Sequence, residues 1–246
     1  MSGTLDYPLA LAVEDFAPVV LTGLGAALLT GPLRRHGART GLTGLTGLTG
    51  LTGTVGTALI LLGGLSKAVW KLVVALDGPD LQVLNKALFP CLSAGFLLLA
   101  HALLTLPAAR GPEPAGGRRT PPLWGFAAAW TATGVVGLLL TSTAPHMVLT
   151  IVAVTVCAVR LILLARSDRD AVAATAGGVW LTGMYVLGPL AARPDQSVAL
   201  QWVEQSANTL TQGAFVLLAW RLARRRRTDP SPAPSPSSPP AERRRA

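Results

Sequence analysis

The sequence predicts an all-α, multi-pass membrane protein built as a bundle of seven transmembrane helices. Three observations lead to this fold class. Only 13% of the 246 residues are charged, against about 25% in soluble domains. Hydrophobic residues make up 50% of the chain, and the mean hydropathy is +0.49. The apolar residues gather into segments of about 20, the length at which a helix crosses a bilayer core of roughly 30 Å. The lipid bilayer is therefore the first expected partner.

Seven segments meet this criterion of length and apolar character. In chain order they are residues 8–30, 55–76, 82–108, 122–142, 147–165, 171–191 and 198–221. Turn and charge signals separate them, notably Gly31-Pro32, the run from Asp77 to Asp80, and Asp168–Asp170. The connection at Ser142–His146 is only a few residues long, so a six-span bundle is the alternative.

Basic residues gather in alternate connections and predict the orientation. They stand in the first, third and fifth connections: Arg34, Arg35, Arg39, Arg110, Arg118, Arg119, Arg166 and Arg169. The other connections hold Asp77, Asp80 and Asp195, and their basic residue is Arg193. Cytoplasmic loops are rich in Lys and Arg, so we expect an outside N-terminus and a cytoplasmic C-terminus at the plasma membrane. This pattern requires an odd number of spans, which favours seven.

Two low-complexity segments flank the expected spans. A Gly-Leu-Thr repeat occupies residues 41–54, and fused to the second span it would make a helix too long for one crossing. We therefore expect it in the first cytoplasmic loop. Residues 1–222 form the predicted transmembrane domain, and residues 223–246 are basic and rich in Pro and Ser. Such a segment buries too little apolar surface to fold, so a disordered cytoplasmic tail is expected.

Charged residues within the spans are the main functional signal. The lysines of this chain, Lys67, Lys71 and Lys86, all fall within or at the edge of spans. A charge near the bilayer centre costs about 2.5–3.5 kcal/mol on insertion scales, so it is rare unless paired or used. Glu14 and Asp15 in the first span lie at a depth similar to that of the lysines. Their opposite charges predict a polar cluster in the outer half of the bundle.

The seventh span extends this cluster inward. Glu204, Asn208 and Gln212 recur at a spacing of four residues and so share one helix face. A polar stripe in lipid must turn towards protein or water. We therefore expect an outward-facing polar cavity between the first, second, third and seventh spans.

Three functions fit such a cluster. The charges could bind or pass a small anionic or zwitterionic solute, or a proton. Alternatively, they could be packing ion pairs in a structural or interaction protein without transport activity. A membrane-embedded enzyme is the third alternative, although no HExxH or GxSxG motif occurs. The spacing of Cys and His residues predicts no metal site and no cofactor. The basic runs lack interleaved aromatics, so no nucleic-acid partner is expected.

Overall fold

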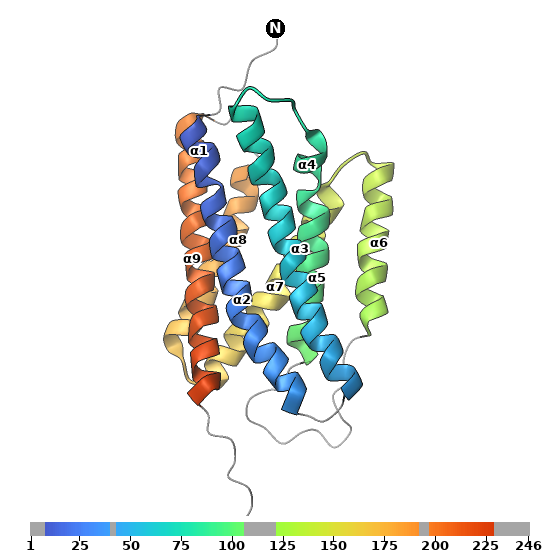
Figure 1. Cartoon of the computed structure of the whole chain (residues 1–246), viewed down its shortest axis with the longest axis vertical. Coiled ribbons are helices and arrows are strands. Elements are labelled where there is room, and N and C mark those ends of the chain that lie inside the picture. The colour runs from blue at the N-terminus through green and yellow to red at the C-terminus, as the bar shows by residue number, and fades with distance from the viewer. Residues whose placement is uncertain (1–7, 40–42, 106–121, 192–196, 229–246) are drawn as a thin grey trace, which may run out of the picture.

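The computed structural model describes residues 8–39, 43–105, 122–191 and 197–228, which form helices joined by short turns. In chain order the helices are α1 (Leu9–Glu14), α2 (Phe16–Arg39), α3 (Thr43–Ala75), α4 (Gln82–Lys86), α5 (Leu88–Thr105), α6 (Leu123–Leu139), α7 (Ala144–Ser167), α8 (Ala171–Ala191) and α9 (Val198–Thr228). Helices α1 and α2 form one interrupted rod, as do α4 and α5 (Figure 1). The described part of the chain therefore forms seven rods, as the sequence predicts.

Prolines explain both interruptions. Pro18 and Pro90 have no N–H to offer the carbonyl four residues earlier, and their rings clash with it. These carbonyls belong to Glu14 and Lys86, the residues at which α1 and α4 end. Each proline therefore coincides with a break in its rod. The break before Pro18 carries the same sequence signal.

Three helices end with a residue in the left-handed region. Asp77, Thr141 and Arg169 have φ values of 55°, 50° and 54°. In each case the next residue donates its backbone N–H to a carbonyl five positions earlier, the pattern of a Schellman cap. The cap at Thr141 separates α6 from α7, so the short connection near Ser142 is confirmed as a turn between two helices.

Several boundaries differ from the sequence prediction. Helix α2 continues through Gly31-Pro32 to Arg39. Helix α3 begins at Thr43, so the described part of the Gly-Leu-Thr repeat is helical and continuous with the second predicted span. The expected loop is wrong there, because each turn of the repeat continues the backbone hydrogen bonds of α3. Likewise, α9 extends to Thr228, six residues into the predicted tail. Residues 229–246 lie outside the described part of the chain.

Six of the rods close into a ring. Helix α2 packs on α3, α3 on α5, α5 on α7, α7 on α8, α8 on α9, and α9 returns to α2. Helix α6 stands outside this ring, where it packs on α7 and α5 (Figure 1). Trp130 of α6 donates an indole N–H to the Pro90 carbonyl at 3.0 Å. The Thr133 hydroxyl lies 3.3 Å from Nδ1 of His146 on α7.

The ring contains two halves of matching direction. Helices α2, α3 and α5 run down, up and down in Figure 1, and α7, α8 and α9 do the same. The halves meet where α5 packs on α7 and where α9 packs on α2. Both contacts join helices that run in the same direction. The two halves thus repeat one order and direction of helices around the ring.

Small residues allow a close contact between the backbones of α3 and α5. A Cβ atom placed on Gly56 would lie 2.7 Å from the Gly95 carbonyl oxygen, and one on Gly95 would lie 2.7 Å from the Gly56 oxygen. Such close backbone approach is typical of helix packing in membranes. Across the ring, buried Trp180 of α8 stacks on Phe215 of α9 with ring centroids 4.6 Å apart.

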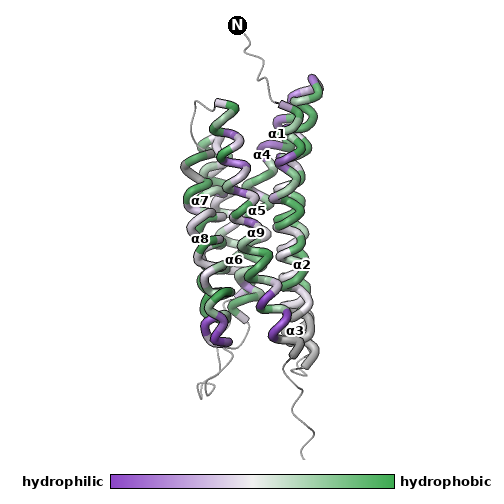
Figure 2. The backbone as a smooth tube through the Cα atoms, turned by 90° about the vertical axis from the view of Figure 1, so that its left-hand side faces the viewer, coloured by the Kyte–Doolittle hydropathy of each residue, from purple (hydrophilic) through white to green (hydrophobic). Residues whose placement is uncertain are grey.

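Four of the described helical stretches are long and apolar enough to cross a bilayer. They are Leu9–Gly31, Leu48–Ala75, Gln82–Thr105 and Ala144–Ser167. Two more stretches, Leu123–Leu139 and Ala171–Leu187, are apolar but shorter. Figure 2 shows the apolar stretches along the helices and more hydrophilic segments near their ends. These features support a protein that resides in a membrane.

Candidate functional site

A cavity of about 360 Å³ lies inside the six-helix ring. All six rods of the ring contribute to its wall, whereas α6 contributes none of the lining residues. The sequence predicts a cavity between the first, second, third and seventh spans. Residues from α7 and α8 complete the wall opposite those helices.

The break between α1 and α2 brings two carboxylates to one level of the bundle. Asp15, the residue between the two helices, lines the cavity. One of its oxygens forms an ion pair with Lys71 of α3 at 2.6 Å, and the other accepts a hydrogen bond from Nε2 of Gln205 on α9. The Glu14 carboxylate accepts a hydrogen bond from the Thr209 hydroxyl at 2.9 Å.

The three lysines occupy different environments. Lys71 pairs with Asp15, and its side chain is 12% exposed. Lys67, one turn along α3, lines the cavity and lies within Coulombic range of Asp15 and Glu204. Lys86 is exposed in the last turn of α4 and is not part of the cavity wall.

Helix α9 supplies the polar wall of the cavity. Glu204, Asn208 and Gln212 all line it, together with Gln205. The Gln212 amide donates to Oδ1 of Asn208 at 3.3 Å, which links two successive turns of the stripe. Gln205 is 4% exposed, and its Oε1 meets no hydrogen-bond donor among the described residues. Because Nε2 of Gln205 is used by Asp15, Oε1 is a buried acceptor within the helix bundle.

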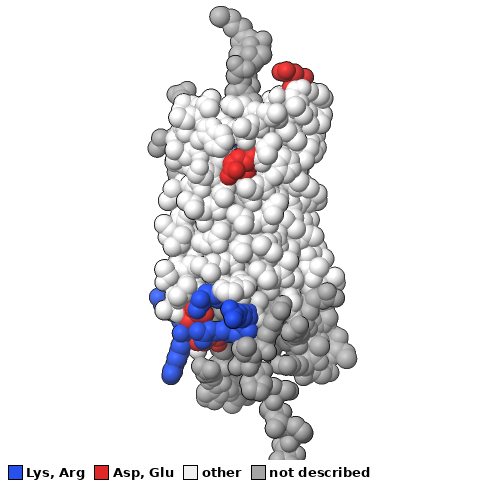
Figure 3. Space-filling model, turned by 60° about the vertical axis from the view of Figure 1, so that its left-hand side comes forward, with Lys and Arg blue, Asp and Glu red and all other residues white. Residues whose placement is uncertain are grey.

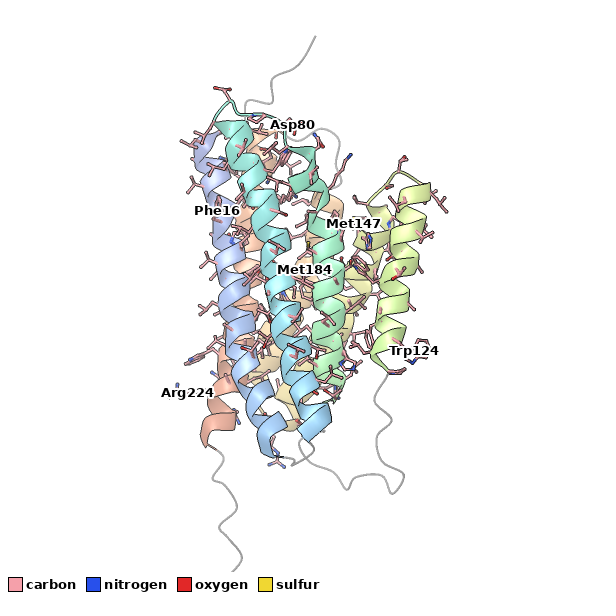
Figure 4. The ribbon with its side chains drawn as sticks, turned by 45° about the vertical axis from the view of Figure 1, so that its right-hand side comes forward. Phe16, Asp80, Trp124, Met147, Met184 and Arg224 are labelled. Carbon is pink, nitrogen blue, oxygen red and sulfur yellow. The ribbon has the colours of Figure 1, made fainter. Side chains whose placement is uncertain are left out.

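The remaining walls are largely apolar. Helix α5 contributes Phe89 and Phe96, α7 contributes Met147, and α8 contributes Met184. Figure 4 labels Met147 and Met184 in the middle part of the bundle. Methionine side chains are flexible and polarizable, so they adapt to the shape of an apolar group. The cavity thus has a charged part near Asp15 and Lys67 and an apolar part against α5, α7 and α8.

The structure brings most of the predicted site residues together. Five of them line the cavity: Asp15, Lys67, Glu204, Asn208 and Gln212. Lys71 contacts the lining residue Asp15, whereas Glu14 bonds Thr209, and neither Glu14 nor Thr209 lines the cavity. Sequence analysis missed Gln205 and Thr209. The signal was present, because Gln205, Asn208 and Gln212 follow the i, i+3, i+7 spacing of one helix face.

A second charged cluster lies at the other end of the bundle. Asp170, which is 2% exposed, caps α8 by accepting the N–H of Ala173 at 3.0 Å. Arg221 and Arg225 of α9 approach the same carboxylate at 3.0 and 2.9 Å. Burial raises the pKa of Asp170. Hydrogen bonds from Arg221 and Ala173, together with the positive charges of Arg221 and Arg225, lower the pKa by more than burial raises it. The pKa of Asp170 therefore lies below its ordinary value. Figure 3 shows basic side chains gathered around acidic atoms at this end.

The two ends of the bundle differ in charge. Arg166, Arg169, Arg221, Arg224 and Arg225 lie at the end that contains the turn between α7 and α8, whereas Asp77 and Asp80 lie at the opposite end. At that acidic end, Asp80 accepts hydrogen bonds from Trp70 at 2.7 Å and from Gln82 at 2.5 Å. These two bonds lower the pKa of the exposed Asp80 carboxyl. Within the described residues, no group of three or more His, Cys, Asp or Glu side chains is arranged to hold a metal ion.

No protein-family model, curated protein or solved structure matches this chain.

Proposed function

We propose that this protein spans the plasma membrane seven times, binds a small anionic or zwitterionic solute in the central cavity, and passes it across the bilayer. The observation that carries this proposal is the closed ring of helices around a cavity of about 360 Å³, which contains charged and amide side chains. A ring that served packing alone would fill its interior with interdigitating side chains, because protein interiors leave few voids larger than a water molecule.

Two features support seven crossings. Helix α6 has 17 residues and is about 26 Å long at 1.5 Å per residue, close to the thickness of the bilayer core. Helix α9 has low hydropathy because its polar stripe lines the cavity and its last turns are basic. Lipid contacts only the faces of such a helix that lie away from the cavity. The hydropathy averaged over the whole helix therefore understates how well it can span a bilayer.

The charge difference between the two ends supports the orientation. With the arginine-rich end in the cytoplasm, the helices obey the positive-inside rule. The polar part of the cavity then faces the outside, since Glu204 lies six residues, or about 9 Å, from the start of α9 at Val198. A solute would enter from that side.

The matching halves of the ring support passage rather than binding alone. In many transporters, two structural repeats rock against each other around a site at their interface. Here, residues from both halves line the cavity, and the halves meet at two pairs of helices that run in the same direction. The ion pair between Lys71 and Asp15 lies within one half and would move with it as a unit.

The test is the access of a cavity cysteine to water from each side of the membrane. Asn208→Cys, in a background carrying Cys91→Ala and Cys157→Ala, is treated with a small charged thiol reagent in intact cells and in inverted vesicles. Leu210→Cys, two residues along the same helix and 74% exposed on the outer face of the bundle, is the matched lipid-facing control.

Each outcome has a defined meaning. Labelling of Asn208→Cys from both sides, with Leu210→Cys unreactive, supports passage across the membrane. Labelling from one side alone overturns passage and leaves a binding protein. If Asn208→Cys is labelled from neither side, the proposal is overturned, and the alternative in which the intramembrane charges serve packing is favoured.

A further inference from the structure

We infer that the outer face of α9 binds a phospholipid with an anionic headgroup, whose phosphate is held by Arg224 beside Trp220. The site lies outside the central cavity, and the inference requires only that the bundle resides in a membrane. Three features carry it: an exposed apolar row along α9, tryptophans that mark where this row meets the two bilayer surfaces, and an exposed arginine just beyond one of them.

The apolar row faces away from the bundle. Leu210, Leu217 and Trp220 are 74%, 39% and 42% exposed, and Arg224 is exposed one turn further along. Spacings of seven, three and four residues place these side chains on one helix face. Gly213 belongs to the same row, and a Cβ atom there would meet nothing within 4 Å. Within the described residues, no other helix covers this row, so in a membrane its neighbours are acyl chains.

Two tryptophans set the depth of this face in the bilayer. Trp202, which is 39% exposed, precedes Trp220 by five helical turns, so the two share a face and lie about 27 Å apart. This distance is close to the bilayer core of roughly 30 Å, and tryptophans gather at both of its surfaces. Leu210, about 15 Å from Trp220, then lies near the bilayer centre. An acyl chain of one leaflet therefore covers the row from Leu210 to Trp220.

A tryptophan of another helix supports the same level. Trp124, in the first turn of α6, is 73% exposed. Figure 4 labels Trp124 and Arg224 on opposite sides of the same end of the bundle. This end therefore carries an exposed tryptophan on two sides, which is typical of the boundary between acyl chains and headgroups.

Arg224 is placed to bind a phosphate at this boundary. Its guanidinium carbon lies 5.3 Å from the centroid of the Trp220 ring, a cation–π contact that holds the side chain on the outer face. Arg221 and Arg225 both pair with Asp170. In contrast, no described acidic side chain forms an ion pair with Arg224. A guanidinium binds phosphate oxygens through two parallel N–H groups, and the phosphates of lipids lie at this depth.

The surrounding charge favours an anionic headgroup over a zwitterionic one. Arg166 and Arg169 are also exposed at this end of the bundle. A zwitterionic headgroup carries an ammonium next to its phosphate, which these arginines repel, whereas an anionic headgroup carries none. Each arginine near the surface strengthens the binding of anionic lipid by about fivefold.

The experiment measures lipid binding to the purified full-length protein by native mass spectrometry. Phosphatidylglycerol is the anionic lipid, and phosphatidylcholine with the same acyl chains is the zwitterionic one. We expect phosphatidylglycerol to bind about fivefold or more tightly. Glycerol 3-phosphate offers the phosphate without acyl chains, and we expect it to show no measurable binding.

Variants locate the site on α9. Arg224→Gln should weaken phosphatidylglycerol by about fivefold. Arg166→Gln is the matched control, because it removes an exposed arginine at the same end but on α7, and it should keep the affinity of the parent. Trp220→Leu keeps the apolar row and removes the ring beside Arg224, so it should weaken binding by about two- to fivefold. The melting temperatures in phosphatidylcholine show that each variant is folded.

The outcomes distinguish a defined site from its alternatives. Equal binding of the two lipids overturns the inference. If Arg166→Gln weakens phosphatidylglycerol as much as Arg224→Gln does, the attraction is spread over the basic end, and the site on α9 is overturned. If glycerol 3-phosphate binds as tightly as the lipid, the ligand is a free phosphate ester. None of these results depends on the labelling of Asn208→Cys, which tests the cavity separately.

Discussion

Lys71 Nζ lies 2.6 Å from Oδ2 of Asp15 and so joins α3 to the residue between α1 and α2. The two side chains are 12% and 10% exposed. Gln205 of α9 donates to the other oxygen of the same carboxylate. Asp15 therefore connects three rods of the ring at the level where the first rod is interrupted.

Removing the Lys71 ammonium should destabilise the fold. Lys71→Met removes the ion-pair partner of the buried Asp15 carboxylate, and breaking one side of a buried ion pair costs about 3–5 kcal/mol. The double variant Lys71→Met/Asp15→Asn should recover a large part of this loss, because neither charge is then stranded. The measurement is the unfolding free energy in detergent, with the exposed Lys86→Met as control. Additive losses in the double variant would contradict the pairing.

Gly95→Ala should loosen the contact between α3 and α5. The added methyl group would lie 2.7 Å from the Gly56 carbonyl oxygen and 2.9 Å from the backbone nitrogen of Ile60, neither of which can rotate away. Overpacking of this kind costs about 1–3 kcal/mol. Gly178→Ala is the matched control, since a Cβ there meets nothing within 4 Å and alanine favours helix by about 1 kcal/mol. Melting temperatures of the two variants should shift in opposite directions.

The contribution of Asp170 should depend on pH in a defined direction. Its pKa is lower in the folded protein than in the unfolded chain, so the ionised carboxylate stabilises the fold at pH values above the unfolded value of about 3.9. This stability is lost as the pH falls through the folded pKa. The difference in melting temperature between the parent and Asp170→Asn should therefore be constant near neutral pH and shrink only in strong acid.

Asp168→Asn is the control for this effect. Arg225 contacts the backbone carbonyl of Asp168 at 2.7 Å, which the substitution preserves. We expect the pH profile of this variant to follow that of the parent. A loss of the Asp170 effect that begins near pH 6 would contradict a lowered pKa.

Trp130→Phe should release α6 from the ring without unfolding the bundle. The substitution removes the indole N–H that bonds the Pro90 carbonyl, at a cost of about 1 kcal/mol. Amide hydrogen exchange should quicken in α6 and stay unchanged in α3. Trp124→Phe, at the 73% exposed tryptophan of the same helix, should change neither. Equal acceleration in α3 would contradict the peripheral position of α6.

The sequence predicts the rods well because each depends on local signals. Apolar length marks their middles, and turn residues such as Asp77 and Ser142 mark their ends. The errors occur where two signals compete. Gly31-Pro32 resembles a terminator, yet α2 passes through it. The Gly-Leu-Thr repeat looks like a loop, yet its described part continues α3, since nothing in it prevents backbone hydrogen bonding.

The site is predicted less completely, because sequence gives the depth of a residue but little about the direction in which its helix faces. The sequence predicts Lys67, Lys71 and Asp15 in the outer half of the bundle. Depth alone does not show that Lys71 takes the direct ion pair with Asp15 while Lys67 faces the cavity. Lys86 has the right depth too, but its side chain is exposed at the end of α4. Helix rotation and neighbour order, which depend on contacts distant in sequence, decide these cases.

The position of α6 outside the ring has a consequence for topology. Without this crossing, α7 would begin at the end where α5 finishes, and the second half would be inverted relative to the first. With it, both halves begin at the acidic end and finish at the basic end. Helix α6 adds nothing to the cavity wall, but it makes the number of rods odd. An odd number of rods is thus what allows two halves of equal polarity to enclose one chamber.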